Sequence, residues 1–443
     1  MTPSPARNAA KAVVEALSRA GFEACFAGGC VRDELLGLLP QDYDVATSAR
    51  PDDVVALFDD TSTVGKEFAV VHVKLGDVVT EVATFRRDLG YSDGRHPDSV
   101  AFADAREDAL RRDFTVNGMF LDPLADRVID FVGGKDDLAA RLIRAIGDPL
   151  ARFTEDRLRL VRAPRFAARL DFAVEEATAR AIRALAPRLA DVSPERVTLE
   201  LVKGLMHPSR ARFVGLMDDL ALLEVVLPEV AAMKGVRQSP VFHPEGDVFE
   251  HTLALLERLE NPTWPLVLAA LFHDAGKVVA RRENPEGEFY RHEQHGALLV
   301  ETVAARLKLS NADRDRAAWL VRKHMALLHV REMRLSTLRR LFAEEGYPEL
   351  LALARADTLA AGADLSWYDE CLSRYKELSR KELKPLRLVT GDDLIELGLR
   401  PGPIFAELLE TVYEEQLAGV VTSKADALAF VKGRLLRKPP AKG

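Results

Sequence analysis

Cysteine is scarce in this sequence: only Cys25, Cys30 and Cys371, among 443 residues, carry a thiol. They are too few and too scattered for a disulfide framework or a cysteine zinc site, so a reducing, cytoplasmic setting is expected. Long apolar runs are also missing, since the longest spans only Trp264 to Phe272. A membrane-spanning helix needs about 20 such residues, and no membrane association is expected.

The chain also lacks an excess of positive charge. Its 61 lysines and arginines stand against 69 aspartates and glutamates, which gives a formal net charge of -8. Bulk charge therefore gives no sign of nucleic-acid binding, and an RNA site would have to be a local basic patch. At roughly 100–200 residues per domain, the length predicts two to four domains.

Strand patterns are confined to the first 150 residues. Alternating residues predict strands over Glu23–Ala27 and Asp42–Ala46, and a hairpin of Val70–Leu75 and Val78–Phe85 around the turn Gly76-Asp77. Apolar spacing predicts intervening helices, which are Ala9–Ala20, Cys30–Leu36 and Asp52–Phe58. From Pro149 onward apolar residues recur every three or four positions, as in helices.

The fold class expected from these patterns is α+β, a small mixed-sheet head followed by an all-α remainder. Composition breaks at Lys234–Gly246 and near Ser379–Gly391 resemble linkers, and the tail Lys438–Gly443 is expected to be disordered. The expected regions are a head over 1–148, a helical neck over 149–235, a further helical domain over 236–375 and a helical C-terminal region over 376–443.

Three carboxylates in the head are expected to converge. Asp42 and Asp44 lie two residues apart on a predicted strand, and period-two geometry directs both side chains to one face. Glu81 alternates in phase on the predicted hairpin and reaches the same place if the hairpin lies beside that strand. Such a cluster needs cations, and hard oxygen ligands suit Mg²⁺.

A second feature of the head is Gly28-Gly29, which precedes Arg32 on a short predicted helix. Glycines let backbone N–H groups approach a phosphate, and a helix N-terminus favours an anion. Arg32 can add a charge-assisted hydrogen bond.

Together these features resemble the family of class II CCA-adding tRNA nucleotidyltransferases and bacterial poly(A) polymerases, which belong to the polymerase-beta-like nucleotidyltransferases. The resemblance covers nearly the whole chain. It is carried by five segments: Gly28–Gly37 with Asp42–Thr47, Arg111–Asn117, Asp130–Gly134, Glu155–Phe166 and Ser193–Arg196.

The resemblance implies roles for these segments. Arg111, Arg112 and Asn117 would contact the sugar and triphosphate, although Gly118 follows where the family often has alanine. Asp130–Gly134 would connect the head to the neck. A charged loop at the position of Phe85–Pro97 helps the family switch from adding C to adding A, which argues against an enzyme that adds C alone.

The segment from Glu155 is expected to select the nucleotide. Asp156 and Arg159 lie three residues apart and would be neighbours on one helix face. A carboxylate acceptor beside a guanidinium donor fits the pairing edges of cytosine and adenine, and it leaves groups unpaired against guanine and uracil. Arg162 and Arg165 continue the spacing and could hold phosphates, while Pro164 would break or kink a helix here.

A second site is expected in the region 236–375, which resembles an HD-type domain. His251, His273, Asp274 and Asp357 follow the order of HD phosphohydrolases, in which imidazoles and carboxylates bind divalent metals that activate water. His292 (or His295) and His324 match further ligands of the fuller pattern.

The function expected from the sequence is template-independent addition of C and A to the 3′ end of tRNA from CTP and ATP, with Mg²⁺ at the head. An enzyme that adds A alone and a poly(A) polymerase share these motifs. The alternative from another class is an HD metal-dependent phosphohydrolase whose head only binds RNA.

Overall fold

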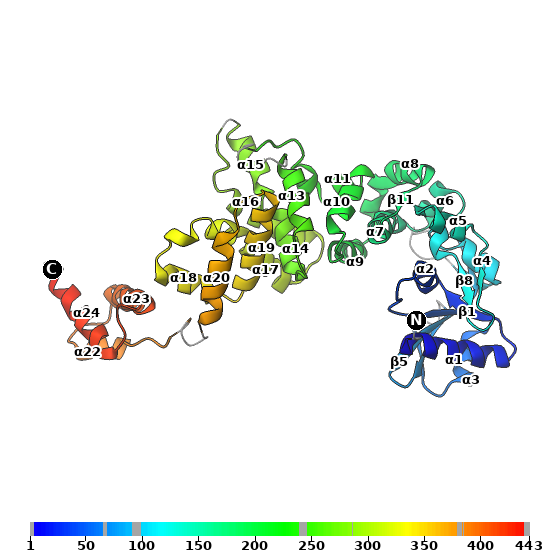
Figure 1. Ribbon diagram of the computed structural model, residues 1–443, viewed down its shortest axis with the longest axis horizontal. Coiled ribbons are helices and arrows are strands. Elements are labelled where there is room, and N and C mark those ends of the chain that lie inside the picture. Colours follow the sequence, from blue (N-terminus) through cyan, green and yellow to red (C-terminus); the bar gives the residue numbers. More distant parts are fainter. Residues whose placement is uncertain are drawn as a thin grey trace. The chain divides into compact units, whose positions relative to one another are not determined.

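The computed structural model describes residues 4–64, 69–90, 99–238, 246–285, 287–378, 383 and 385–437. They form two compact units, the first of residues 1–232 with 306–308 and the second of residues 233–305 with 309–443 (Figure 1). The expected tail, Tyr91–Pro97 of the charged segment and parts of both expected linkers lie outside the described residues. No described helix is long and apolar enough to cross a membrane.

The head is built on a seven-stranded mixed sheet with the order β3-β4-β5-β2-β1-β8-β9. Its strands are β1 Ala24–Ala27, β2 Asp44–Thr47, β3 Thr61–Val64, β4 Val70–Leu75, β5 Val78–Thr84, β8 Phe120–Asp122 and β9 Arg127–Ile129. A separate two-stranded sheet pairs β6 (Arg86–Leu89) with β7 (Ser99–Phe102). The predicted α+β class is confirmed.

The predicted hairpin is also confirmed, since β4 and β5 pair antiparallel with Leu75 opposite Val78 across the Gly76-Asp77 turn. β5 lies beside β2 in parallel register, with Val45 opposite Val82. The next residue toward the N-terminus on each strand is Asp44 and Glu81. The sheet therefore brings these two carboxylates to neighbouring positions.

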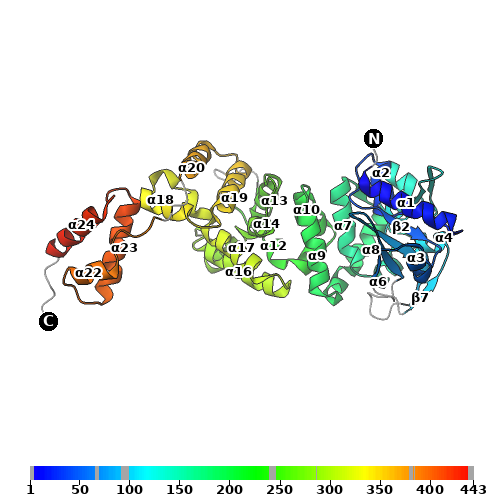
Figure 2. The ribbon, with the colours of Figure 1, turned by 90° about the horizontal axis from the view of Figure 1, so that it is seen from below.

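Helices cover both faces of the head sheet. α1 (Pro5–Arg19) and α3 (Pro51–Leu57) pack on one face (Figure 2). Strand alternation turns Cys25 and Ala27 to the other face, where they cluster with Phe85, Phe120 and α4 (Ala105–Leu110). Side chains at the N-caps start several helices by accepting backbone N–H bonds, and these caps are Ser4 of α1, Asp104 of α4 and Asp148 of α6 (Pro149–Glu155).

The rest of the first unit is a helical neck joined to the head by a short connector. The head also contains α2 Gly29–Leu35 and η2 Thr115–Asn117. The connector holds α5 Gly134–Ala139 and β10 Leu142–Ile143, which pairs with β11 Ala173–Val174. The neck helices are α6 Pro149–Glu155, α7 Arg159–Leu170, α8 Glu176–Leu185, η3 Ala186–Asp191, α9 Pro194–Leu205, α10 Arg210–Asp219, α11 Leu223–Val226 and α12 Pro228–Ala231.

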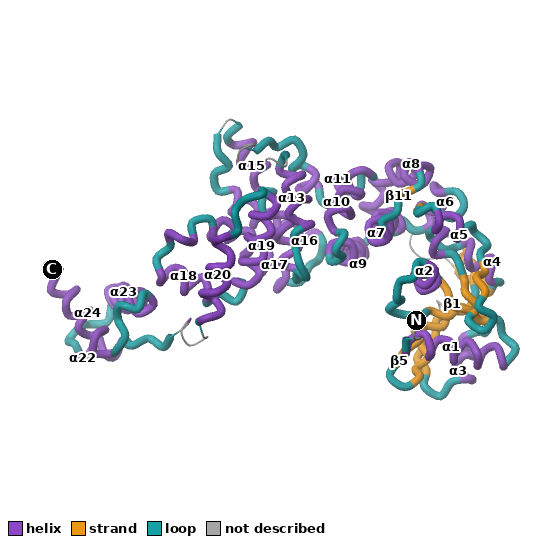
Figure 3. Tube along the Cα trace, in the orientation of Figure 1, coloured by secondary structure: helices purple, strands orange, loops and turns teal. Residues whose placement is uncertain are grey.

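The second unit is helical throughout its described residues, in which no strand follows Val174 (Figure 3). Its larger part comprises α13 Val248–Glu257, α14 Trp264–Phe272, α15 Gly276–Glu283, α16 His292–Arg306, α17 Asn311–Lys323, η4 His324–Leu327, η5 Val330–Glu332, α18 Leu335–Phe342, α19 Tyr347–Ala360 and α20 Ser366–Glu377. A small apolar core, including Leu394, Leu408 and Val431, joins α22 Gly391–Glu396, α23 Pro403–Leu417 and α24 Lys424–Arg437.

Two local expectations were wrong. The strand carrying the head aspartates begins at Asp44, so Asp42 lies in the preceding loop. The expected charged loop is in part a strand, because Arg86–Leu89 forms β6. At Pro164, where a broken or kinked helix was expected, α7 is unbroken and continues to Leu170.

Packing between α9 and α10 depends on a glycine, which gives a matched test. A Cβ on Gly204 would lie 2.5 Å from the Phe213 ring, whereas a Cβ on Gly215 would meet nothing within 4 Å. Gly204→Ala should therefore destabilise the protein by about 1–3 kcal/mol through overpacking. Gly215→Ala should stabilise it by about 0.5–1 kcal/mol, because alanine is the better helix former. Denaturant unfolding of both variants measures the difference, and equal effects would contradict this packing.

Candidate functional site

The largest concentration of candidate residues surrounds a cavity of about 830 Å³ in the first unit. The head contributes Gly28, Gly29, Arg32, Asp33, Gln41, Asp42, Asp44, Arg111, Arg112, Asp113 and Asn117, and the neck contributes Asp156, Arg159, Arg162, Arg165, Phe166, Ala168, Arg169, Lys203, Gly204, His207 and Ser209. Every residue expected to bind the nucleotide lines it. Among these described residues, eight arginine or lysine side chains stand against five aspartates, so the cavity favours a polyanion.

The Gly28-Gly29 turn needs glycine at its first position for two reasons. Gly28 has φ +75°, a conformation that side chains rarely adopt, and a Cβ there would lie 2.9 Å from Arg112 Nη1. The Gly28 N–H donates to the Met119 carbonyl at 3.3 Å. The turn thus brings the backbone of β1 close to the arginines that line the cavity.

The three head carboxylates interact electrostatically. Asp42 and Asp44 line the main cavity, while Asp44 and Glu81 share an adjoining cavity of about 260 Å³ with Arg86, Arg111 and Arg112. Removal of water around Asp44, together with the negative charges of Glu81 and Asp42, raises the pKa of Asp44 to about 7. A bound cation would relieve this repulsion, so the donor set fits a hard divalent metal.

A buried carboxylate fixes the two arginines of the head. Asp108 on α4 accepts from Arg111 Nη2 at 2.7 Å and from Arg112 Nη2 at 3.0 Å. Burial alone would raise the pKa of Asp108, but Arg112 and Arg111 outweigh it and hold the pKa below its usual value. Asp108 thus holds both arginines at the wall of the cavity.

A second buried carboxylate, Asp113, joins the head to the neck. It accepts from Arg162 Nη2 at 2.7 Å and from Asn117 Nδ2 at 3.1 Å. Burial would raise the pKa of Asp113, but Arg162 and the Asn117 bond lower it to about 2. Asn117 in turn accepts from Arg32 Nη1 at 2.5 Å, and Arg32 also pairs with Asp33 at 2.6 Å. Arg32 is only 2% exposed. Its main role is therefore to fix Asn117 and Asp33 in the wall of the cavity, and little of its side chain is accessible from the cavity.

The expectation that Asp156 and Arg159 share a helix face was wrong. α6 ends at Glu155, Asp156 has an extended backbone, and α7 begins at Arg159. Asp156 Oδ1 accepts the Leu158 N–H at 3.1 Å, as an aspartate does in a turn when it bonds the backbone two residues on. Both residues line the cavity, so a break between helices brings them there.

Each member of this pair is held by other residues. Asp156 accepts from Arg196 Nη2 at 3.2 Å. Arg159 donates to Glu155 Oε2 at 2.9 Å and to the Arg111 carbonyl at 2.8 Å. Asp156 and Arg159 do not pair with each other in these contacts. The carboxylate acceptor and the guanidinium donor therefore line the cavity independently.

The sequence reasoning missed several residues of the cavity. Arg196, for which no role in the site was predicted, does not line the cavity itself but contacts Asp156, which does. Lys203, His207 and Ser209 come from the end of α9 and the turn before α10, and no motif marked them. Only the tertiary packing of α7 against α9 and α10 brings them to the cavity.

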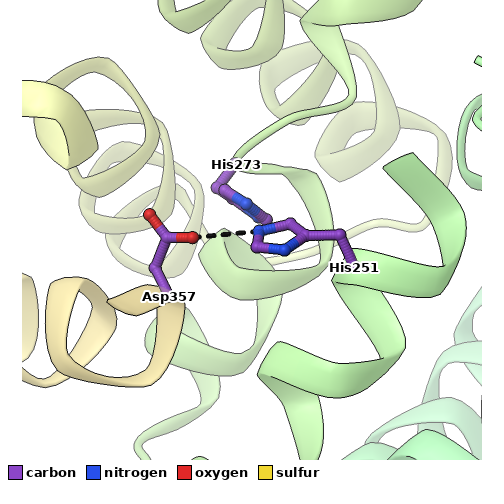
Figure 4. Close-up of side chains that lie close together, drawn as sticks. All are labelled: His251, His273 and Asp357. Carbon is purple, nitrogen blue, oxygen red and sulfur yellow. Dashed lines mark ion pairs between the residues drawn. The ribbon is translucent and has the colours of Figure 1, made fainter. Parts of the chain in front are cut away.

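The second unit holds a compact group of histidines and aspartates. The donor atoms of His251, His273 and Asp357 lie within 4.8 Å of one another (Figure 4), and so do those of Asp274, His292 and His324. The two groups touch, because His273 Nε2 lies 3.2 Å from Asp274 Oδ2. The structure thus brings together all six residues singled out in the sequence. His295, the alternative to His292, instead pairs with Glu283 at 3.5 Å.

Three of the histidines are oriented in the same way. The Nδ1 atoms of His273, His292 and His324 each lie 2.7–2.8 Å from the carbonyl oxygen three residues earlier. A carbonyl can only accept, so each Nδ1 carries a proton, and in the neutral form of each ring the lone pair of Nε2 faces the centre of the group. Burial and the neighbouring His273 lower the pKa of His324 to about 4, which keeps this ring neutral.

This donor set fits one or two divalent metal ions. A cavity of about 1120 Å³ opens beside it, lined by Asp274, His292, His324 and Asp357 together with Lys277, Arg281, Phe289, Tyr290 and Arg291. Lys277 Nζ lies 2.7 Å from Asp274 Oδ2. Within the described residues, two groups have donor atoms close enough together to share an ion: His251, His273 and Asp357, and Asp274, His292 and His324.

Three family profiles match the chain in order. The Poly A polymerase head domain matches residues 24–144, the probable RNA and SrmB-binding site of polymerase A matches residues 171–234, and the HD domain matches residues 248–362. The mixed sheet with its glycine turn and neighbouring carboxylates thus defines a nucleotidyltransferase fold, followed by helical and HD regions.

Similarity to known proteins identifies the family within the class of nucleotidyltransferases. The chain is 32% identical over 406 residues to a CCA-adding enzyme of Pediococcus pentosaceus, covering 90% of this chain and 91% of that one. A crystal structure of the Bacillus stearothermophilus CCA-adding enzyme in complex with CTP matches with a TM-score of 0.72, 29% identity and 98% coverage of both chains. The chain belongs to the family of CCA-adding enzymes and bacterial poly(A) polymerases.

Other matches are shorter. Poly(A) polymerase I of Haemophilus influenzae is 38% identical over 233 residues, which cover 50% of this chain and 51% of that protein. With this and several further relatives, the chain matches about half of the relative's own length.

Proposed function

We propose that this protein adds C and A nucleotides to the 3′ end of tRNA, taking them from CTP and ATP and releasing pyrophosphate. The observation that carries the proposal is the single cavity that joins the head carboxylates to Asp156 and Arg159 of the neck. Membership of the family and the likeness to a CTP-bound CCA-adding enzyme support it.

In the proposed reaction the RNA 3′-hydroxyl attacks the α-phosphate of CTP or ATP, and the bond to pyrophosphate breaks. Asp42 and Asp44, with Glu81 as a third carboxylate, would hold Mg²⁺, which in such sites stabilises charge on the attacking and leaving oxygens. The residues around the Gly28-Gly29 turn, together with Arg111 and Arg112, would bind the triphosphate. Arg162 and Arg165 would extend this positive wall along α7.

Asp156 and Arg159 would read the base. The carboxylate of Asp156 has lone pairs beyond those used by Arg196 and the Leu158 N–H, and it can accept from the amino group of cytosine or adenine. Arg159 would donate to the adjacent ring nitrogen. Guanine and uracil present the opposite order and would leave both groups unpaired.

The proposal divides the chain into a catalytic head over 1–148, a selecting and RNA-binding neck over 149–235, an HD-type domain over 236–375 and a C-terminal helical region over 376–443. A cytoplasmic location goes with it, because all three cysteines are free thiols.

The near alternatives are an enzyme that adds only A and a poly(A) polymerase. Incubation of the purified protein with tRNA that lacks CCA, with each triphosphate singly and with all four together, separates them. CCA addition requires incorporation from CTP first and a product that ends in CCA. Extension by A alone, or an unlimited A tract, would contradict the proposal.

Removal of either head aspartate should stop addition while the fold is kept. Asp42→Ala and Asp44→Ala each delete a carboxylate on which metal binding depends, and such a metal contributes several kcal/mol of charge stabilisation in the transition state. Asp59→Ala is the matched control, because this exposed aspartate of the head lines neither cavity. Single-turnover incorporation of CMP measures the effect, and near-normal rates in either variant would overturn the metal assignment.

Base selection should depend on Asp156. Asp156→Ala removes the acceptor for the amino group of C and A, at a cost of about 1–3 kcal/mol by analogy with other base contacts, or roughly ten- to a hundredfold. Discrimination against G and U should shrink at the same time, since the repelling carboxylate is gone. Arg159→Ala should weaken C and A alike. Incorporation of all four nucleotides is the measurement, and unchanged selectivity in both variants would mean that selection lies elsewhere.

A second candidate function is metal-dependent phosphoester hydrolysis in the second unit. The observation favouring it is the convergence of six metal-type ligands at the edge of a cavity that also holds Lys277, Arg281 and Arg291. The cations can bind a phosphate, and the neighbouring rings of Phe289 and Tyr290 offer a surface for a base. This function would be additional to nucleotide addition.

The HD site should be separable from the head. His273→Ala or Asp274→Ala should remove divalent metal and abolish hydrolysis of a chromogenic phosphodiester, while nucleotide addition continues. His295→Ala should keep both, because His295 lies outside the group although it shares α16 with His292. Metal analysis by mass spectrometry beside the two assays provides the test. An unchanged metal content in the His273 and Asp274 variants would make these residues structural.

A further inference from the structure

The cavity of about 830 Å³ in the first unit, called the nucleotide cavity below, is lined in part by residues that have no role in the proposed nucleotide binding. Lys203, Gly204, His207 and Ser209 line it from the end of α9 and the turn before α10. They are the lining residues that lie within 171–234, the segment matching the RNA-binding profile. The RNA-binding segment therefore meets the cavity at this turn.

His207 is fixed there in one tautomer. The backbone N–H of Ser209 donates to His207 Nδ1 at 3.2 Å, and Ser209 Oγ lies 2.7 Å from the same nitrogen. A nitrogen that accepts an N–H carries no proton, so the neutral ring must carry its proton on Nε2. Burial, with the positive charges of Arg169 and Arg210, lowers the pKa of His207. His207 is therefore a neutral N–H donor at the cavity wall.

Lys203 supplies a positive charge beside this donor. Its side chain is 58% exposed, and its only close carboxylate in the described structure is Glu200, at 3.7 Å. Glu200 pairs more closely with Arg165, at 2.5 Å. The positive charge of Lys203 is therefore only weakly neutralised and can attract a ligand. Gly204 of α9 lets this helix pack closely against the Phe213 ring of α10, and this contact holds the turn between the two helices in place.

We infer that Lys203 and His207 form a subsite for the phosphodiester group next to the 3′-hydroxyl of the RNA, with the Ser209 hydroxyl donating to His207 Nδ1 and so holding the ring in place. The inference rests on the proposed function. One charged donor and one neutral N–H donor suit a phosphodiester, which carries a single negative charge. The triphosphate carries several negative charges, and in the proposed function the arginines of the head and of α7 bind it.

Two substitutions separate the charged and the neutral donor. Lys203→Gln should raise the Kd for tRNA about three- to tenfold, and it should flatten the plot of log Kd against log salt by about 0.7, because one phosphate contact of a single strand is lost. His207→Ala should raise the Kd to a similar extent without changing that slope, since the ring is neutral. His207→Gln, whose amide can donate in place of Nε2, should recover part of the affinity.

The measurements are equilibrium binding of the full-length protein to tRNA lacking CCA over a salt series, and the KM for CTP. Lys74→Gln is the matched control, because it removes the same charge from an exposed position on β4 that does not line the cavity. The control should change neither the Kd nor the salt slope to the extent that Lys203→Gln does, and the KM for CTP should stay the same in all variants.

Two results would overturn the inference. A raised KM for CTP with an unchanged tRNA Kd would assign these residues to the triphosphate. An unchanged Kd in both the Lys203 and His207 variants would leave the turn without a part in RNA binding. Failure of the unaltered protein to extend tRNA would instead contradict the proposed function. The Kd for tRNA is measured without extension, so the two failures can be told apart.

Discussion

Buried carboxylates that hold the arginines of the nucleotide cavity are the constraint on which the first unit depends. A cavity for a polyphosphate needs several guanidinium groups close together, and those groups repel one another. Asp108, Asp113 and Glu200 each fix one or two of them at 2.5–3.0 Å. Removal of one partner from such a buried pair costs about 3–5 kcal/mol, so the carboxylates support both the fold and the binding surface.

The same network determines how head and neck meet. Asp113 belongs to the head and Arg162 to α7, and Arg169 of α7 also reaches Asp33 on α2 at 3.1 Å. Because these pairs cross between the head and the neck, the groups expected to bind the phosphates and those expected to read the base are held at a fixed separation. A substitution in one of the buried carboxylates would therefore disturb nucleotide position without touching the nucleotide.

Local patterns in the sequence predicted the parts of the head that depend on near neighbours. The β4–β5 hairpin follows from alternation and a glycine turn, and α2 lies where a short helix was predicted after the Gly28-Gly29 turn. The position of Asp156 did not follow, because helix propensity near Glu155 gives no sign that the chain breaks there. That break is stabilised by Arg196, forty residues away, and single-sequence periodicity cannot show a contact of this range.

The six HD residues were found from the sequence for a different reason. Histidine is rare in this chain, with ten in total, so an ordered set of histidines and aspartates stands out where arginines do not. The choice between His292 and His295 still needed the structure. Both lie near the start of α16, but only the first residue of the helix faces Asp274, at 3.4 Å, while His295 faces Glu283.

The arrangement of α7, α9 and the turn before α10 gives the neck two kinds of contact within one cavity. In the proposed function Asp156 and Arg159 distinguish the base of a nucleotide, whereas the inferred subsite of Lys203 and His207 would contact a backbone that is the same at every RNA end. A base-reading pair needs fixed geometry, and here each member has its own anchor in Arg196 or Glu155. A backbone contact tolerates motion, and Lys203 is accordingly exposed and loosely paired.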